Sequence, residues 1–170
     1  TIYSTLRNTL ENGYGLRDII ESIDTLKFKN NEARYELSVL YEERLNKMGN
    51  AGRSGGELYT PRAVIKAIIK VIDPKVGETV FDPAVGSAGF LCACYDYMTE
   101  SRENLSTNEL QLIQKDTFFG KEKKKLPFVL GVMNMILHGI EAPNIVRTNT
   151  LEENLRDIQE KDRYDVILAN

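Results

Sequence analysis

Residues 81–91, with the sequence Phe-Asp-Pro-Ala-Val-Gly-Ser-Ala-Gly-Phe-Leu, constrain the fold more than any other stretch of the chain. An apolar run ends in Asp82, a turn with two glycines follows, and an apolar helix pattern then begins. Gly86 and Gly89 lack a Cβ atom, so the backbone there can turn sharply and approach a ligand closely. Ligands of open α/β sheets bind where strands end and helices begin. The segment therefore predicts a strand–turn–helix unit that holds a small anionic or nucleotide-like ligand, although an ordinary strand-to-helix turn fits the same pattern.

From residue 60 onward, strand and helix patterns alternate. Thr60 and Pro61 predict the start of a helix, because Thr caps helices well and Pro is favoured at the first helical position. The polar stretch 99–114 predicts a surface insertion. The other expected strands and helices span residues 79–81 (strand), 88–98 (helix), 117–120 (strand), 126–137 (helix), 144–147 (strand) and 164–169 (strand). This alternation predicts right-handed crossovers and a parallel sheet, which is an α/β fold of the doubly wound kind.

The first 50 residues have a helical pattern and give no strand signal. Apolar residues recur there at a spacing of three to five, which predicts one packed face consisting of Tyr35, Val39, Leu40, Leu45 and Met48. Glycine-rich residues 49–56 predict a flexible hinge. We therefore expect a helical N-terminal segment at residues 1–52 and the N-terminal part of an α/β domain at residues 53–170.

The last residues of the chain resemble a strand that has been cut short. We therefore expect a fragment of a longer protein. A fourth strand left as a bare edge would favour pairing with a second chain, so we also expect a tendency to self-associate.

Charge and cysteine content narrow the function classes. The formal net charge is -3 and the pI about 5.4, which argues against a domain that grips nucleic acid alone, since duplex binding normally needs a basic stripe. A DNA-modifying subunit whose partner supplies the grip remains compatible. Cys92 and Cys94 form neither a disulfide framework nor a metal-site pattern, so we expect a reducing, cytoplasmic compartment and no metal. No apolar run reaches the roughly 18 residues that a membrane helix needs.

Two familiar nucleotide-binding patterns do not fit the sequence. Residues 120–122, Gly-Lys-Glu, lack the preceding spaced glycine and the following Ser or Thr of a phosphate-binding loop. The three-glycine fingerprint of dinucleotide-binding folds is absent as well.

Five segments, taken in order, resemble the modification (M) subunit of type I restriction-modification systems, a family of adenine-specific DNA methyltransferases. Their candidate site residues are Glu57, Leu58, Tyr59, Thr60, Pro61 and Arg62; Asp82, Gly86, Ser87, Ala88 and Gly89; Glu122; Asn149; and Asn170. The resemblance implies a Rossmann-like class I methyltransferase domain, represented by its first four strands, with S-adenosyl-L-methionine as cofactor and adenine N6 as the methylated atom.

The resemblance also implies a role for each segment. Residues 57–62 would close over the methionine end of the cofactor, and residues 82–89 would form its glycine-containing loop. Glu122 would accept hydrogen bonds from the ribose hydroxyls. Asn149 stands where the family usually has an Asp that contacts the cofactor's adenine, and an amide can both accept and donate there. Asn170 would open the catalytic Asn-Pro-Pro-aromatic loop and accept a hydrogen bond from the target amino group.

Because only the first residue of that loop lies in the chain, we expect that residues 1–170 do not methylate DNA by themselves. The expected partners are DNA, reached through a separate specificity subunit, and the specificity and restriction subunits of a prokaryotic complex. Two alternatives stay open. One is another amino-group methyltransferase, acting on RNA or on a protein glutamine. The other is a non-catalytic assembly module, which cofactor binding would exclude.

Overall fold

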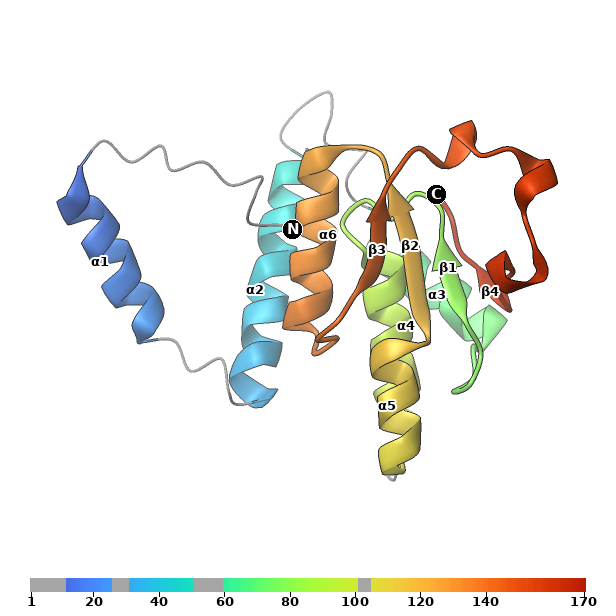
Figure 1. Ribbon diagram of the computed structural model, residues 1–170. Coiled ribbons are helices and arrows are strands. Elements are labelled where there is room, and N and C mark those ends of the chain that lie inside the picture. Colours follow the sequence, from blue (N-terminus) through green and yellow to red (C-terminus); the bar gives the residue numbers. More distant parts are fainter. Residues whose placement is uncertain (1–11, 26–30, 51–59, 101–104) are drawn as a thin grey trace.

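The computed structural model describes residues 12–25, 31–50, 60–100 and 105–170. Its centre is a four-stranded parallel sheet with the order β3-β2-β1-β4 (Figure 1). The strands are β1 (Val80–Asp82), β2 (Phe118–Glu122), β3 (Asn144–Arg147) and β4 (Val166–Ile167). The helices are α1 (Gly13–Asp24), α2 (Asn31–Asn50), α3 (Arg62–Ile72), α4 (Gly89–Glu100), α5 (Thr107–Lys115) and α6 (Lys125–Leu137). Three short 3-10 turns, Thr150–Glu152, Leu155–Asp157 and Glu160–Asp162, connect β3 to β4. The predicted parallel α/β fold is confirmed.

The hydrophobic core lies between the sheet and a layer of helices. Helix α4 packs between α3 and α6, and α2 packs against the other side of α6. Val80, Leu91, Phe118 and Met135 are fully buried there. Strand β1 is buried along its whole length, because it has neighbouring strands on both sides. None of the helices in the described part of the chain has the length and apolar character that a membrane crossing requires.

Parallel pairing brings the carboxyl ends of the strands to one edge of the sheet. Val80 pairs with Phe118 and with Val166, so β1, β2 and β4 end close to one another. Figure 1 shows the end of the chain at the same edge as the arrowheads of β2 and β3. Asp82, Glu122 and Asn170 are thereby placed at one edge, where α/β folds bind ligands.

The stretch expected as a surface insertion at 99–114 contains a helix that was not predicted. Helix α4 continues to Glu100, and residues 107–115 form α5. The Ser106 side chain accepts from the Glu109 backbone N–H, and the Glu109 carboxylate accepts from the Ser106 N–H, which makes a capping box. Ile113 is buried against the core and anchors the helix. A polar composition therefore concealed a short amphipathic helix.

The expected packed face of α2 is also wrong in part. Val39 and Leu40 are exposed, while Ser38 and Leu45 are buried. Tyr41 lies between them and donates its hydroxyl proton to the Leu130 carbonyl on α6 at 3.1 Å. The residues of α2 that face α6 recur at helical spacing, and they are buried or half-buried whether they are polar or apolar. The side chains of Tyr35 and Met48 and the boundary at residue 52 lie outside the described residues.

Strand β4 and the start of α3 differ from expectation in detail. Strand β4 has only two paired residues and lies at an edge of the sheet, where self-association through it stays a prediction. The residue that precedes α3 is Pro61, and no side chain caps the helix. The Thr60 hydroxyl makes no capping bond to α3 and accepts a hydrogen bond from Asn170. On α3, Ile65 and Ile69 are buried, whereas Val64 and Ile72 are exposed.

Helix α6 approaches the loop after β1 so closely that only glycine fits at one position. A Cβ atom on Gly131 would lie 2.7 Å from the Gly86 carbonyl oxygen. That carbonyl belongs to the backbone, so the loop or the helix would have to move. The sequence signal for this contact is a glycine inside an otherwise apolar helix pattern.

We predict that Gly131→Ala lowers the free energy of unfolding by about 1–3 kcal/mol, the usual cost of overpacking a tight core. Urea denaturation followed by circular dichroism measures this change. Gly13→Ala is the matched control, because a Cβ atom at Gly13 on α1 would meet nothing within 4 Å. Equal stability of the Gly131→Ala and Gly13→Ala proteins would contradict the close approach of α6 to the loop.

Candidate functional site

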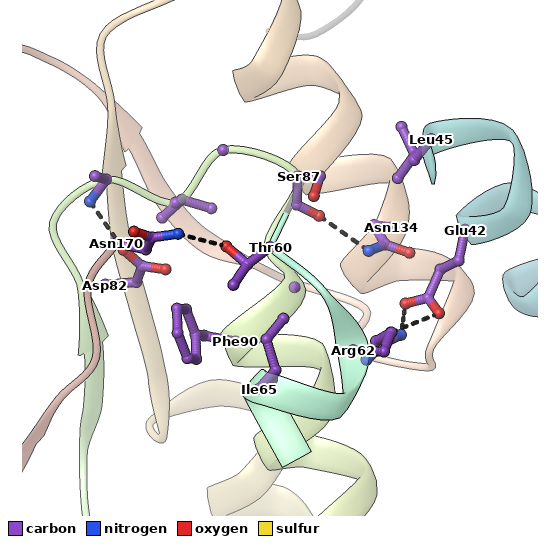
Figure 2. A pocket seen from close by; sticks show the side chains of 14 residues that line it. Glu42, Leu45, Thr60, Arg62, Ile65, Asp82, Ser87, Phe90, Asn134 and Asn170 are labelled. Atoms are coloured by element: carbon purple, nitrogen blue, oxygen red, sulfur yellow. Dashed lines mark hydrogen bonds and ion pairs between the residues drawn. The ribbon is translucent and has the colours of Figure 1, made fainter. Parts of the chain in front are cut away.

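A cavity of about 270 Å³ opens at the carboxyl ends of the strands. Four parts of the chain line it: α2, the beginning of α3, the segment from the end of β1 into α4, and α6, together with the last residue (Figure 2). Of the candidate site residues, the cavity brings together Thr60, Arg62, Asp82, Gly86, Ser87, Gly89 and Asn170. This size is near the lower limit of about 300 Å³ for small-molecule sites.

The loop after β1 has a strained backbone that its neighbours hold in place. Gly86 has φ 55° and Ala88 has φ 62°, in the left-handed region that favours glycine. A non-glycine residue there costs of order 1–3 kcal/mol and persists only where its surroundings fix it. The Val85 N–H donates to the Lys121 carbonyl at 3.0 Å, and the Ser87 carbonyl accepts from Asn134 at 2.9 Å. The loop therefore has a fixed shape in this structure.

Asp82 is the buried acidic group of the cavity. Its side chain is almost fully buried, and Oδ1 accepts from the Ala84 N–H at 2.9 Å. Burial raises the pKa of Asp82 to about 6, the nearby negative charge of Glu122 adds to the rise, and the Ala84 hydrogen bond opposes it. A desolvated carboxylate at a cavity wall favours a cationic ligand, because a positive charge would offset the cost of ionisation.

Glu122 supports the loop from the adjacent strand. One carboxylate oxygen accepts from the Gly86 N–H at 2.9 Å, and the other accepts from the Lys124 N–H at 2.7 Å. Glu122 is not among the residues that line the cavity. A carboxylate oxygen has more than one lone pair, so ribose hydroxyls could still share it. The ribose role of Glu122 stays a prediction.

Thr60 and Asn170 meet although 110 positions separate them in the sequence. The Asn170 side-chain nitrogen donates to the Thr60 hydroxyl oxygen at 3.0 Å (Figure 2). In this orientation the amide nitrogen faces Thr60, and Oδ1 is directed elsewhere. Asn170 itself is exposed to solvent, so its Oδ1 can accept from an incoming group.

Arg62 joins the start of α3 to α2. Its Nε donates to Glu42 Oε2 at 2.9 Å, and its Nη2 pairs with Glu42 Oε1. The Arg62 side chain is 22% exposed, and its Nη1 is buried without a hydrogen-bond partner among the described residues. Arg62 therefore has a structural partner, and the N–H groups of Nη1 remain for a ligand.

The other candidate residues lie outside the cavity lining or outside the description. Pro61 is exposed and Ala88 is buried within the loop. Asn149 starts a 3-10 turn, where its Oδ1 accepts from the Leu151 N–H at 3.4 Å and its Nδ2 donates to Glu152. Residues 51–59, which include Glu57, Leu58 and Tyr59, are not described.

Sequence reasoning missed several lining residues. Glu42 and Leu45 come from α2, which lies far from the motifs in the sequence, and no sequence pattern marks them. Asn134 is 1% exposed in a helix that is otherwise strongly apolar. A single polar residue within an apolar helix pattern was the sequence signal that could have identified it. A buried amide of this kind needs partners, and Ser87 supplies one.

Comparison with known proteins gives one consistent family. A family model described as N-6 DNA Methylase matches residues 32–170. The chain is 37% identical over 169 residues to the type I restriction enzyme EcoEI methylase subunit of Escherichia coli, covering 99% of this chain and 34% of that protein.

Solved structures agree. A chain from a structure of type I restriction-modification complex assembly has a TM-score of 0.87 at 38% identity, covering 99% of this chain and 34% of that chain. The crystal structure of a modification subunit from Vibrio vulnificus has a TM-score of 0.84 at 39% identity, with the same 99% and 34% coverage. The chain thus spans about a third of the length of the relatives it matches. Because the family model matches most of the chain, the chain belongs to the N-6 DNA methylase family.

Proposed function

We propose that this chain forms the cofactor-binding part of an S-adenosyl-L-methionine-dependent DNA adenine-N6 methyltransferase, the M subunit of a type I restriction-modification system. The observation that carries the proposal is the hydrogen bond between Thr60 and Asn170 at the mouth of the glycine loop. It joins the segment expected to hold the cofactor to the residue expected to hold the target base. The family supports this reading and does not favour an RNA, protein or assembly role.

The residues present fit that cofactor. Two carboxylates, Glu42 and Asp82, and one guanidinium, Arg62, line the cavity. This set suits a ligand that has both cationic and anionic groups and an overall positive charge. When bound, S-adenosylmethionine supplies an electrophilic methyl group on a sulfonium centre. Gly86 and Gly89 line the cavity and lack a Cβ atom, so the backbone there can approach such a ligand closely.

Asn170 has the role of positioning the target. Its Oδ1, left available by the bond to Thr60, accepts a hydrogen bond from the adenine amino group and directs the nitrogen lone pair toward the methyl donor. The gain is orientation of the two reactants and stabilisation of the positive charge that develops on the amino nitrogen. Glu122 and Asn149 are the proposed contacts for the cofactor's ribose and adenine, and residues 57–59 complete its methionine end.

DNA recognition belongs to a different subunit in this proposal. The net charge of -3 argues against a chain that grips duplex DNA alone, since such binding normally needs a basic stripe. A specificity subunit would read the DNA sequence, and a restriction subunit would join the complex. The proposed location is the prokaryotic cytoplasm.

We predict that Asn170→Ala abolishes methyl transfer while S-adenosylmethionine affinity stays within about threefold, because Asn170 contacts the target rather than the cofactor. Loss of a positioning group of this kind costs about a hundredfold or more in rate. The assay is transfer of labelled methyl groups to DNA by the full-length M subunit that contains residues 1–170, assembled with its specificity subunit, with calorimetry for cofactor affinity. Asn108→Ala, on the exposed surface of α5, is the control. An unchanged rate in Asn170→Ala would exclude this role.

Asp82 generates a pH prediction. The folded-state pKa of about 6 lies above the ordinary value, so folding favours the protonated acid. The contribution of Asp82 to the free energy of unfolding is complete below the ordinary pKa of about 4. It is lost as the pH rises through 6. Between pH 5 and pH 8, the wild-type protein should lose about 1 kcal/mol of unfolding free energy relative to Asp82→Asn. Urea denaturation at both pH values measures the difference, and parallel curves for the two proteins would rule out the raised pKa.

A further inference from the structure

Asn134 has a side-chain orientation that its own hydrogen bond determines. Its Nδ2 donates to the Ser87 carbonyl at 2.9 Å, and a carbonyl can only accept, so the nitrogen must be the atom facing Ser87. The Oδ1 atom therefore faces the opposite direction. Figure 2 shows this oxygen on the side of Glu42, away from the glycine loop.

The Oδ1 atom is a buried acceptor that lacks a donor. Asn134 is 1% exposed, and its Oδ1 has no hydrogen-bond partner among the described residues. Leaving such an atom unpaired is costly, so native proteins usually satisfy it with a side chain, an ordered water or a ligand. Asn134 lines the cavity, so a ligand there can supply the missing donor.

The surroundings indicate which donor fits. The Glu42 carboxylate lines the same cavity and adds negative charge on the side that Oδ1 faces. Arg62 lies beside it and brings a positive charge, with Nη1 buried and unpaired among the described residues. A neutral acceptor and a carboxylate suit an ammonium group, and a guanidinium suits a carboxylate. The three side chains together match the end of a free α-amino acid, where an ammonium and a carboxylate share one carbon.

We propose that Asn134 Oδ1 accepts a hydrogen bond from the α-ammonium group of the cofactor's amino-acid end. This proposal rests on the proposed function, because it assumes that the cavity holds S-adenosylmethionine. It adds a recognition residue from α6, outside the segments that the sequence motifs mark. It also links cofactor binding to loop shape, since the same amide holds the Ser87 carbonyl.

The test combines removal of the side chain with removal of the ligand group. S-adenosylhomocysteine, its analogue without the α-amino group, and 5′-methylthioadenosine, which lacks the whole amino-acid end, are titrated into wild-type and Asn134→Ala proteins by calorimetry. We expect removal of the amino group to weaken binding to the wild type about tenfold or more. In Asn134→Ala the same removal should change the affinity less than twofold. Asn108→Ala, exposed on α5, should behave as the wild type does.

Other outcomes of the titrations distinguish a direct contact with the ammonium group from an effect through the glycine loop. If Asn134→Ala weakens all three ligands by the same factor, Asn134 acts only through the glycine loop, and the proposal is overturned. The same holds if loss of the amino group costs the variant as much as it costs the wild type. If the wild type binds none of the three, the proposed cofactor site itself fails.

A second measurement does not depend on the variant being folded. The side-chain amide resonances of Asn134 in the wild-type protein should shift in nitrogen–proton spectra when S-adenosylhomocysteine is added, because its Oδ1 gains a charged donor. They should shift much less with the deaminated analogue. Equal shifts with both ligands would contradict the contact.

Discussion

The contact between helix α6 and the loop after β1 is the constraint on which the site depends. Gly131 leaves room for the Gly86 carbonyl, and Asn134 binds the Ser87 carbonyl. From strand β2, the Glu122 carboxylate accepts from the Gly86 N–H. A loop held by both elements can keep a backbone conformation that is unfavourable in isolation, as at Ala88. The shape of the cavity follows from this support.

The electrostatics of the cavity follow from its burial. Asp82 pays a desolvation cost at the end of the fully buried strand β1, with only the Ala84 N–H as a close partner in the described structure. A stability argument alone does not explain a carboxylate there, since an amide would avoid the charge. The proposed affinity for a positively charged ligand would explain it. The Arg62–Glu42 pair adds a second charged wall and ties α2 to the site.

Local patterns predicted the parts of this structure that local chemistry determines. The strand–turn–helix at residues 81–91 follows from an apolar strand, two glycines and an apolar helix, and the structure confirms it. The cap of α5 could also have been predicted, because Ser106 and Glu109 have the spacing of a capping box. The polar composition around them favoured a surface insertion instead. The Thr60–Asn170 hydrogen bond was not readable, since it depends on how β4 packs beside β1. Glu42 became a lining residue only because α2 packs against α6.

The central claim is that the cavity between the glycine loop, Thr60 and Asn170 binds S-adenosylmethionine. Amide chemical shifts of the isotope-labelled protein during cofactor titration test it most directly. The account predicts saturable shifts concentrated at residues 84–89 and at Thr60 and Arg62, with exposed α5 unaffected. Shifts confined to other parts of the chain, or an unchanged spectrum at millimolar cofactor, would contradict it.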